Sequence, residues 1–114
     1  MNRVFISGII AGIPQFKQAG TGAAHLALPL SVRHTTRAGE TRREIYRISA
    51  WNNLARWGAQ NLVTGQRIGL SGYLTQRQTS TDEKKRVCIE IAAIEFFPIE
   101  RIQNTPADRD APPA

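Results

Sequence analysis

Hydrophobic and polar residues alternate in several short segments of the chain, as expected for β-strands that bury one face. The clearest alternation, over residues 25–33, places Leu26, Leu28, Leu30 and Val32 on one side. Comparable segments occur at Arg3–Ile10, Arg42–Trp51, Gln66–Arg77 and Arg86–Phe97. The polar stretches between them, including Gln78–Lys85, are expected to be loops. Pro29 interrupts the second segment, and because proline lacks an amide hydrogen it predicts an edge or bulged position there.

One segment with helical spacing separates the third predicted strand from the fourth. Over Asn52–Val63, Leu54, Gly58 and Leu62 fall on one face, and Gly65 follows as a typical stop signal. Three strands, a helix and two strands predict an all-β fold, a five-stranded oligonucleotide/oligosaccharide-binding barrel with one short helix between strands 3 and 4. The barrel domain is expected to span residues 1–102. Residues 103–114, rich in Pro, Ala and Asp, are expected to form a disordered tail.

Charge narrows the range of possible partners. The 114 residues include 15 Lys and Arg against 9 Asp and Glu, a net charge of +6. Residues 1–81 carry ten basic side chains and only two acidic ones, and arginine outnumbers lysine twelve to three along the chain. Guanidinium groups bind phosphate as a fork and stack on planar rings, so this bias favours a nucleic-acid partner. A solvated basic surface is the alternative interpretation.

The polar faces of the third and fourth predicted strands carry the residue types that single-stranded nucleic acid requires. If the aliphatic faces line the barrel, these outer faces display Arg43, Ile45, Arg47, Ser49, Trp51, Tyr73, Thr75 and Arg77. Cations can follow the phosphates while rings stack on unpaired bases. Trp51 could instead cover the base of the following helix, and Tyr73 could lie in a subunit contact. We expect Trp57 to belong to the core and Tyr46, on the interior or interface face, to be structural.

Other classes of protein find little support in the sequence. No nucleophile–base pair or phosphate-binding GxxxxGK loop is present, and no Cys/His group has metal-ligand spacing, so we expect no enzyme activity, catalytic residue, metal or cofactor. Cys88, the single cysteine, cannot form an intramolecular disulfide. No apolar run reaches the length of a membrane span, and the N-terminus lacks a signal-peptide pattern. We expect no membrane association and a cytoplasmic, nucleoid-associated location.

The order and spacing of several short motifs resemble the bacterial single-stranded DNA-binding proteins from Met1 to about Phe97. The motifs are Met1-Asn2-Arg3-Val4, Tyr46-Arg47-Ile48-Ser49-Ala50-Trp51, Asn53-Leu54-Ala55 and Gly72-Tyr73-Leu74-Thr75-Gln76-Arg77. The resemblance implies a barrel that assembles into a homo-oligomer, dimer or tetramer, and coats single-stranded DNA in replication, recombination or repair. It implies DNA contacts at Arg3, Lys17, Arg47, Trp51 and Arg77. Arg33, Arg43 and Tyr73 are further candidate DNA-binding residues.

Departures from the family pattern leave a second interpretation open. Ile45 and Thr79 stand where the family commonly has aromatic residues, which predicts weaker binding per subunit. The sequence ends Asp110-Ala111-Pro112-Pro113-Ala114, without the acidic, Pro-Phe-tipped tail that recruits partner proteins. These differences suggest an accessory or mobile-element relative. They also fit an adaptor of the primosomal replication protein N type, which acts in replication restart and binds both single-stranded DNA and replication or primosome proteins.

Overall fold

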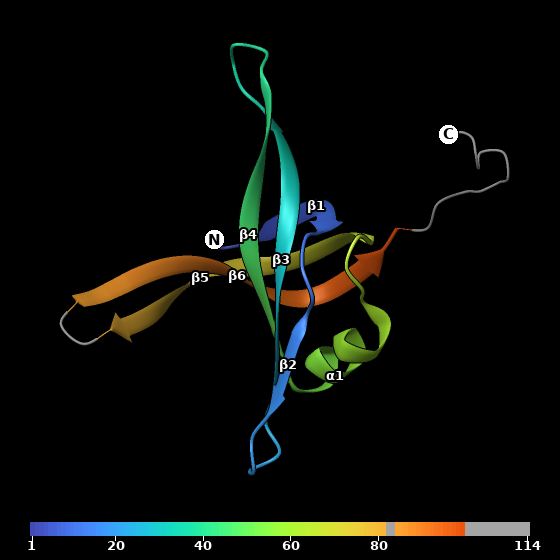
Figure 1. The fold of residues 1–114 in the computed structure, drawn as a ribbon, viewed down its shortest axis with the longest axis vertical. Coiled ribbons are helices and arrows are strands. Elements are labelled where there is room, and N and C mark those ends of the chain that lie inside the picture. The colour runs from blue at the N-terminus through green and yellow to red at the C-terminus, as the bar shows by residue number, and fades with distance from the viewer. Residues whose placement is uncertain (82–83, 100–114) are drawn as a thin grey trace, which may run out of the picture.

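The computed structural model describes residues 1–81 and 84–99, which form a sheet closed into a barrel and one helix (Figure 1). In chain order the elements are β1 (Val4–Ile10), β2 (Gln15–Gln18), β3 (Ala24–Thr35), β4 (Thr41–Trp51), α1 (Asn52–Asn61), β5 (Arg67–Thr81) and β6 (Lys84–Pro98). The side chains of residues 79–81, 84 and 85 are outside this description.

The barrel consists of five strands in the order β1-β5-β6-β4-β3, and pairing of β3 with β1 closes it. Strands β4 and β6 run parallel, and the other pairs are antiparallel. Helix α1 connects β4 to β5, so the predicted five-stranded barrel with one short helix is confirmed. The short strand β2 was not predicted, and it pairs with the first part of β3.

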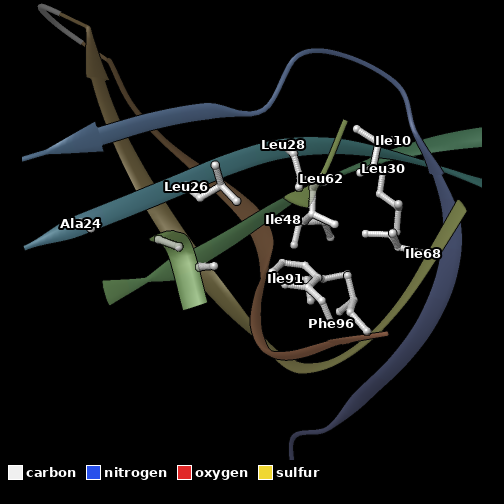
Figure 2. Close-up of a cluster of buried hydrophobic side chains, with 13 residues drawn as sticks. Ile10, Ala24, Leu26, Leu28, Leu30, Ile48, Leu62, Ile68, Ile91 and Phe96 are labelled. Carbon is white, nitrogen blue, oxygen red and sulfur yellow. The ribbon is translucent and has the colours of Figure 1, made fainter. Parts of the chain in front are cut away.

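Aliphatic side chains from the barrel strands meet in one core (Figure 2). Leu26, Leu28 and Leu30 of β3 are each at most 2% exposed, as their alternation predicts. Burying each such side chain stabilises the fold by about 1.5–3 kcal/mol. Helix α1 closes one end of the barrel, and Gly58 permits its close approach, since an added Cβ there would lie 2.5 Å from Cδ2 of Leu26.

Pro29 occupies a position where β3 loses no hydrogen bond to β4. Its carbonyl oxygen accepts a 2.8 Å hydrogen bond from the amide of Ala11, so its own nitrogen faces the same side, away from β4. On that side β3 pairs with β2 through Ala27 and with β1 from Leu30 onward. The proline therefore lies in the gap between two partner strands, in keeping with the edge position that its chemistry requires.

Strands β5 and β6 continue beyond the barrel as a long hairpin (Figure 1). The prediction of a loop over Gln78–Lys85 was wrong, because β5 extends to Thr81 and β6 starts at Lys84. Leu74, Val87 and Ile89 lie on the aliphatic faces of the two predicted strands Gln66–Arg77 and Arg86–Phe97, yet they are 48%, 55% and 66% exposed. Their alternation is that of a half-buried strand, but among the described residues nothing covers these side chains where the hairpin extends beyond the barrel.

A β-bulge changes which face β6 buries. Ser71 pairs with Glu95 and Gly72 pairs with Ala93, so Ile94 is an extra residue in β6. Ile91 and Phe96 are an odd number of positions apart, yet both belong to the core because of this residue.

No helix within residues 1–81 and 84–99 is long and apolar enough to cross a membrane. The tail predicted for residues 103–114 and the last residues of the predicted domain lie outside the described residues.

Candidate nucleic-acid interface

Five of the eight predicted DNA-binding residues line one open groove on the outer face of the barrel. This groove has a volume of about 530 Å³ and receives side chains from five strands. We call it the arginine–tryptophan groove, and its defining residues are Lys17, His25, Arg47, Trp51, Tyr73 and Arg77. The grouping supports the prediction that alternate residues of the third and fourth barrel strands share one surface.

Strand register explains why these side chains converge. His25 of β3 lies between Lys17 of β2 and Trp51 of β4, and residues directly opposite one another in a sheet share a face. Ser49 of β4 pairs with Ala92 of β6, which in turn pairs with Tyr73 of β5. Two rows of cross-strand neighbours therefore build the groove from segments that are far apart in the sequence.

A buried carboxylate lies between the two central arginines of the groove. Oε1 of Glu90 accepts a hydrogen bond from Nε of Arg47 at 3.0 Å and forms an ion pair with Nε of Arg77 at 3.2 Å. The Glu90 side chain is 8% exposed, whereas the two arginine side chains are 38% and 43% exposed. Each guanidinium thus contacts the carboxylate through Nε and keeps its terminal nitrogens for a ligand at the groove surface.

The indole of Trp51 is available to a ligand. It is 55% exposed, and its ring centroid lies 4.3 Å from that of His25 with the rings tilted by 48°. Trp51 also occupies the N-cap position of α1, but its side chain makes no capping hydrogen bond. The alternative in which Trp51 merely covers the helix therefore receives no support from its exposure.

The electrostatic environment of the groove acts on His25. Burial lowers the pKa of this imidazole below its ordinary value, and the positive charge of Arg47 lowers the pKa further. Lys17 and Arg77 act in the same direction, while Glu90 opposes them. An imidazole that resists protonation among cations is expected to gain its proton when a polyanion enters the groove.

Ser49 contributes a hydroxyl with no partner to the floor of the groove. Within the described part of the chain, its Oγ is the single buried side-chain oxygen or nitrogen that lacks a hydrogen bond. Buried polar groups are nearly always paired, because an unpaired one costs about 1–3 kcal/mol. Ser49 is only 1% exposed, so a ligand in the groove reaches this hydroxyl only if neighbouring side chains move.

The remaining predicted contacts lie outside this groove. Arg3 immediately precedes β1, one position before the Val4–Gly72 pair. Arg33 and Arg43 face each other across β3 and β4 and line a separate hollow.

Two aromatic residues differ from expectation. Trp57, predicted to be core, is 38% exposed, although it stacks on Phe96 with ring centroids 6.2 Å apart. Tyr46, expected on the interior or interface face, is 36% exposed and therefore not interior, and its hydroxyl donates a hydrogen bond to Glu44. That hydrogen bond raises the pKa of Tyr46 and lowers the pKa of Glu44.

The sequence model of the single-strand binding protein family matches residues 1–97. The chain belongs to this family. Two curated relatives named single-stranded DNA-binding protein, from Thermus thermophilus, are each 28% identical over 108 residues. The alignments cover 94% of this chain but only 40% and 39% of those proteins. This chain therefore spans about two-fifths of the length of the curated relatives that it matches.

A solved structure gives the same result for the fold. The crystal structure of a deletion mutant of the single-stranded DNA binding protein from Thermus aquaticus superimposes with a TM-score of 0.71 at 27% identity. The match covers 88% of this chain and 51% of that one. Family membership thus agrees with the barrel architecture found in the described residues.

Sequence reasoning did not identify Glu90 and His25 as parts of the groove. Glu90 had one usable signal, since it is an acidic residue on the polar face of a strand whose barrel neighbours carry arginines. His25 had no partner at ligand spacing along the chain, and only strand pairing brings it to Trp51. Two positions hold non-aromatic residues where the family commonly has aromatic ones. Of these, Ile45 is 59% exposed, and the side chain of Thr79 lies outside the described part of the structure.

Proposed function

We propose that the protein binds single-stranded DNA, without strong sequence preference, in the arginine–tryptophan groove. The observation that carries the proposal is the joint placement of an exposed indole, Trp51, and two half-exposed guanidiniums, Arg47 and Arg77, in one open groove. Family membership and the names of the relatives support the same ligand.

The groove chemistry accounts for both affinity and tolerance of sequence. A base stacked on Trp51 contributes roughly 1–3 kcal/mol whatever its identity, because every base has a π-face. Guanidinium groups of Arg47 and Arg77 and the ammonium of Lys17 pair with phosphates, which releases counterions and makes binding salt-dependent.

In the cell, this activity fits roles in replication, recombination or repair in the cytoplasm, with no catalytic step by the protein itself. We also propose a homo-oligomer. Phe5 of β1 is 76% exposed and lines an apolar hollow with Ile6, Leu70 and Phe97. The first part of β1 pairs with β5 alone, which leaves one strand edge open to a second copy. Light scattering at micromolar concentration tests this, and a monomer mass would contradict it.

Fluorescence titration with oligothymidine tests the binding site. We expect the oligonucleotide to quench tryptophan emission and Trp51→Ala to remove most of the quench while weakening binding by roughly 1–3 kcal/mol. Duplex of equal length should bind more weakly.

Trp57→Ala is the matched control for the second indole. Because Trp57 stacks on Phe96, its loss should lower the melting temperature and leave oligothymidine affinity nearly unchanged. Equal affinity of Trp51→Ala and the parent protein, or tighter binding of duplex than of single strand, would contradict the proposal.

A further inference from the structure

A second concentration of positive charge lies away from the groove. Arg33 of β3, Arg43 of β4 and Arg67 of β5 line a small polar hollow of about 230 Å³, together with Ser7 and Ser31. We call it the arginine hollow. Within residues 1–81 and 84–99, none of these three guanidiniums forms an ion pair or a side-chain hydrogen bond.

Strand pairing forces these like charges together. Arg33 and Arg43 are directly opposite in the β3–β4 register, an arrangement that destabilises a sheet unless an anion neutralises it. Arg67 pairs with Ile9, which pairs with Ser31, so a third cation enters the same region from the other side. In the groove, by contrast, a carboxylate holds both central arginines.

The chemistry of the arginine hollow suits a phosphate group. Guanidinium forks match the geometry of phosphate oxygens, and serine hydroxyls can donate further hydrogen bonds. The three guanidiniums come from three different strands of the barrel, so the backbone holds them in place without their own ion pairs.

The arginine hollow also lies on the path that leads out of the groove. On the outer face of β4 the order of side chains is Trp51, Ser49, Arg47, Ile45 and Arg43. A hollow of about 480 Å³ bordered by Ile13, Pro29, Ile45 and Arg47 lies between the two sites. Arg43 and Arg47 are four positions apart along the strand, or about 13 Å, which the sugar–phosphate backbone of one DNA strand can cross.

We propose that the arginine hollow is a second phosphate-binding site for the same DNA strand, reached only by oligonucleotides long enough to pass Ile45. This inference rests on the proposed function. It adds a contact that forms only with long oligonucleotides. Loss of an arginine in the hollow should therefore lower the affinity for long oligonucleotides and not for short ones.

Length-resolved binding tests the inference. Arg67→Ala and Arg43→Ala are titrated with oligothymidine of about 5 and about 15 nucleotides, a span within the site sizes of single barrels. We expect affinity for the long oligonucleotide to fall roughly three- to tenfold at low salt, with a salt slope smaller by about 0.7. Affinity for the short oligonucleotide should stay unchanged.

Arg42→Ala is a matched control, since it removes the same charge one residue away. Arg42 lies on the opposite face of β4, where its side chain is 65% exposed and 3.7 Å from Glu44. The Arg42→Ala variant should bind the short and the long oligonucleotide with the affinity of the parent protein. Melting curves confirm that each variant is folded.

Three results would overturn the inference. The first is that Arg67→Ala weakens binding of both oligonucleotides equally. The second is that Arg42→Ala lowers affinity for the long oligonucleotide as much as Arg43→Ala does. Either result would mean a general effect of net charge. The third result has two parts: inorganic phosphate at constant ionic strength stabilises the parent protein more than the Arg67→Ala variant, and the effect of Arg67→Ala on DNA affinity does not depend on oligonucleotide length. That result would assign the hollow to free phosphate. If instead the short oligonucleotide fails to quench Trp51 in the parent protein, the proposed function itself fails.

Discussion

Replacing Glu90 by glutamine separates the two effects that this carboxylate has on the groove. Its Oε1 binds Nε of Arg47 and of Arg77, so its charge stabilises both guanidiniums in the unliganded protein. The same charge repels any phosphate that approaches them. Glutamine keeps the shape and an acceptor oxygen but removes the charge. We therefore expect Glu90→Gln to be less stable and to bind single-stranded DNA more tightly.

Both magnitudes follow from the geometry. Charge-assisted hydrogen bonds are about twice as strong as neutral ones, and the two arginines are half-exposed, so the loss of stability should be about 1–2 kcal/mol. For a domain of this size that lowers the melting temperature by roughly 5–10 °C. A phosphate on the far side of a guanidinium, about 7 Å from the carboxylate, is repelled by about 1–2 kcal/mol at an effective dielectric constant of 20–40. Affinity at low salt should therefore rise roughly 5- to 30-fold.

Melting curves and oligothymidine titrations at two salt concentrations measure the two effects. Added salt should reduce the gain in affinity, because the phosphate sits at the protein surface. Glu95→Gln is the control, since Glu95 lies on the same strand, is exposed and does not line the groove. It removes an equal charge and should bind like the parent. A folded Glu90→Gln protein that binds more weakly at low salt would refute the reasoning, because orientation of the guanidiniums would then outweigh repulsion.

Three further measurements address other parts of the fold and groove. Gly72→Ala should destabilise the protein by roughly 1–3 kcal/mol in chemical denaturation, because an added Cβ would lie 2.2 Å from a backbone carbonyl oxygen. Gly20→Ala is the control and should leave stability unchanged, since a Cβ there meets nothing within 4 Å. The exposed thiol of Cys88 is opposite Arg77, so bound oligothymidine should slow its alkylation, and an unchanged rate would place the DNA elsewhere. The lowered pKa of His25 means that the unfolded chain takes up its proton more readily, so stability should fall as pH drops below about 6.5. Bound phosphates favour the charged imidazole, so DNA affinity should rise over the same interval, and His25→Gln should remove both effects.

The outer face of β4 could be predicted from sequence because a strand alternates strictly between its faces. Arg47, Ser49 and Trp51 share the groove as the period of two requires. The barrel architecture followed from the order of the elements. In both cases the relevant information is local, since it resides in the spacing of neighbouring residues.

The rest of the site depends on pairing between distant segments. Glu90 meets Arg47 across 43 positions in the sequence, through the parallel pairing of β4 and β6. The bulge at Ile94 shifts the buried face of β6, and alternation alone cannot locate an extra residue. Leu74 and Ile89 are exposed because the hairpin extends beyond the barrel. Whether an alternating strand is buried depends on what packs against it, which its own pattern does not show.

The two arginine clusters differ in net charge, and this difference determines how each responds to salt. Lys17, Arg47 and Arg77 with Glu90 give the groove three positive charges and one negative charge, a net of +2, whereas the three arginines of the hollow give +3. The groove also supplies the stacking ring, and stacking depends little on ionic strength. Short oligonucleotides held in the groove should therefore show a shallow salt dependence. Oligonucleotides long enough to reach the hollow should show a steeper one, because each added phosphate contact releases further counterions.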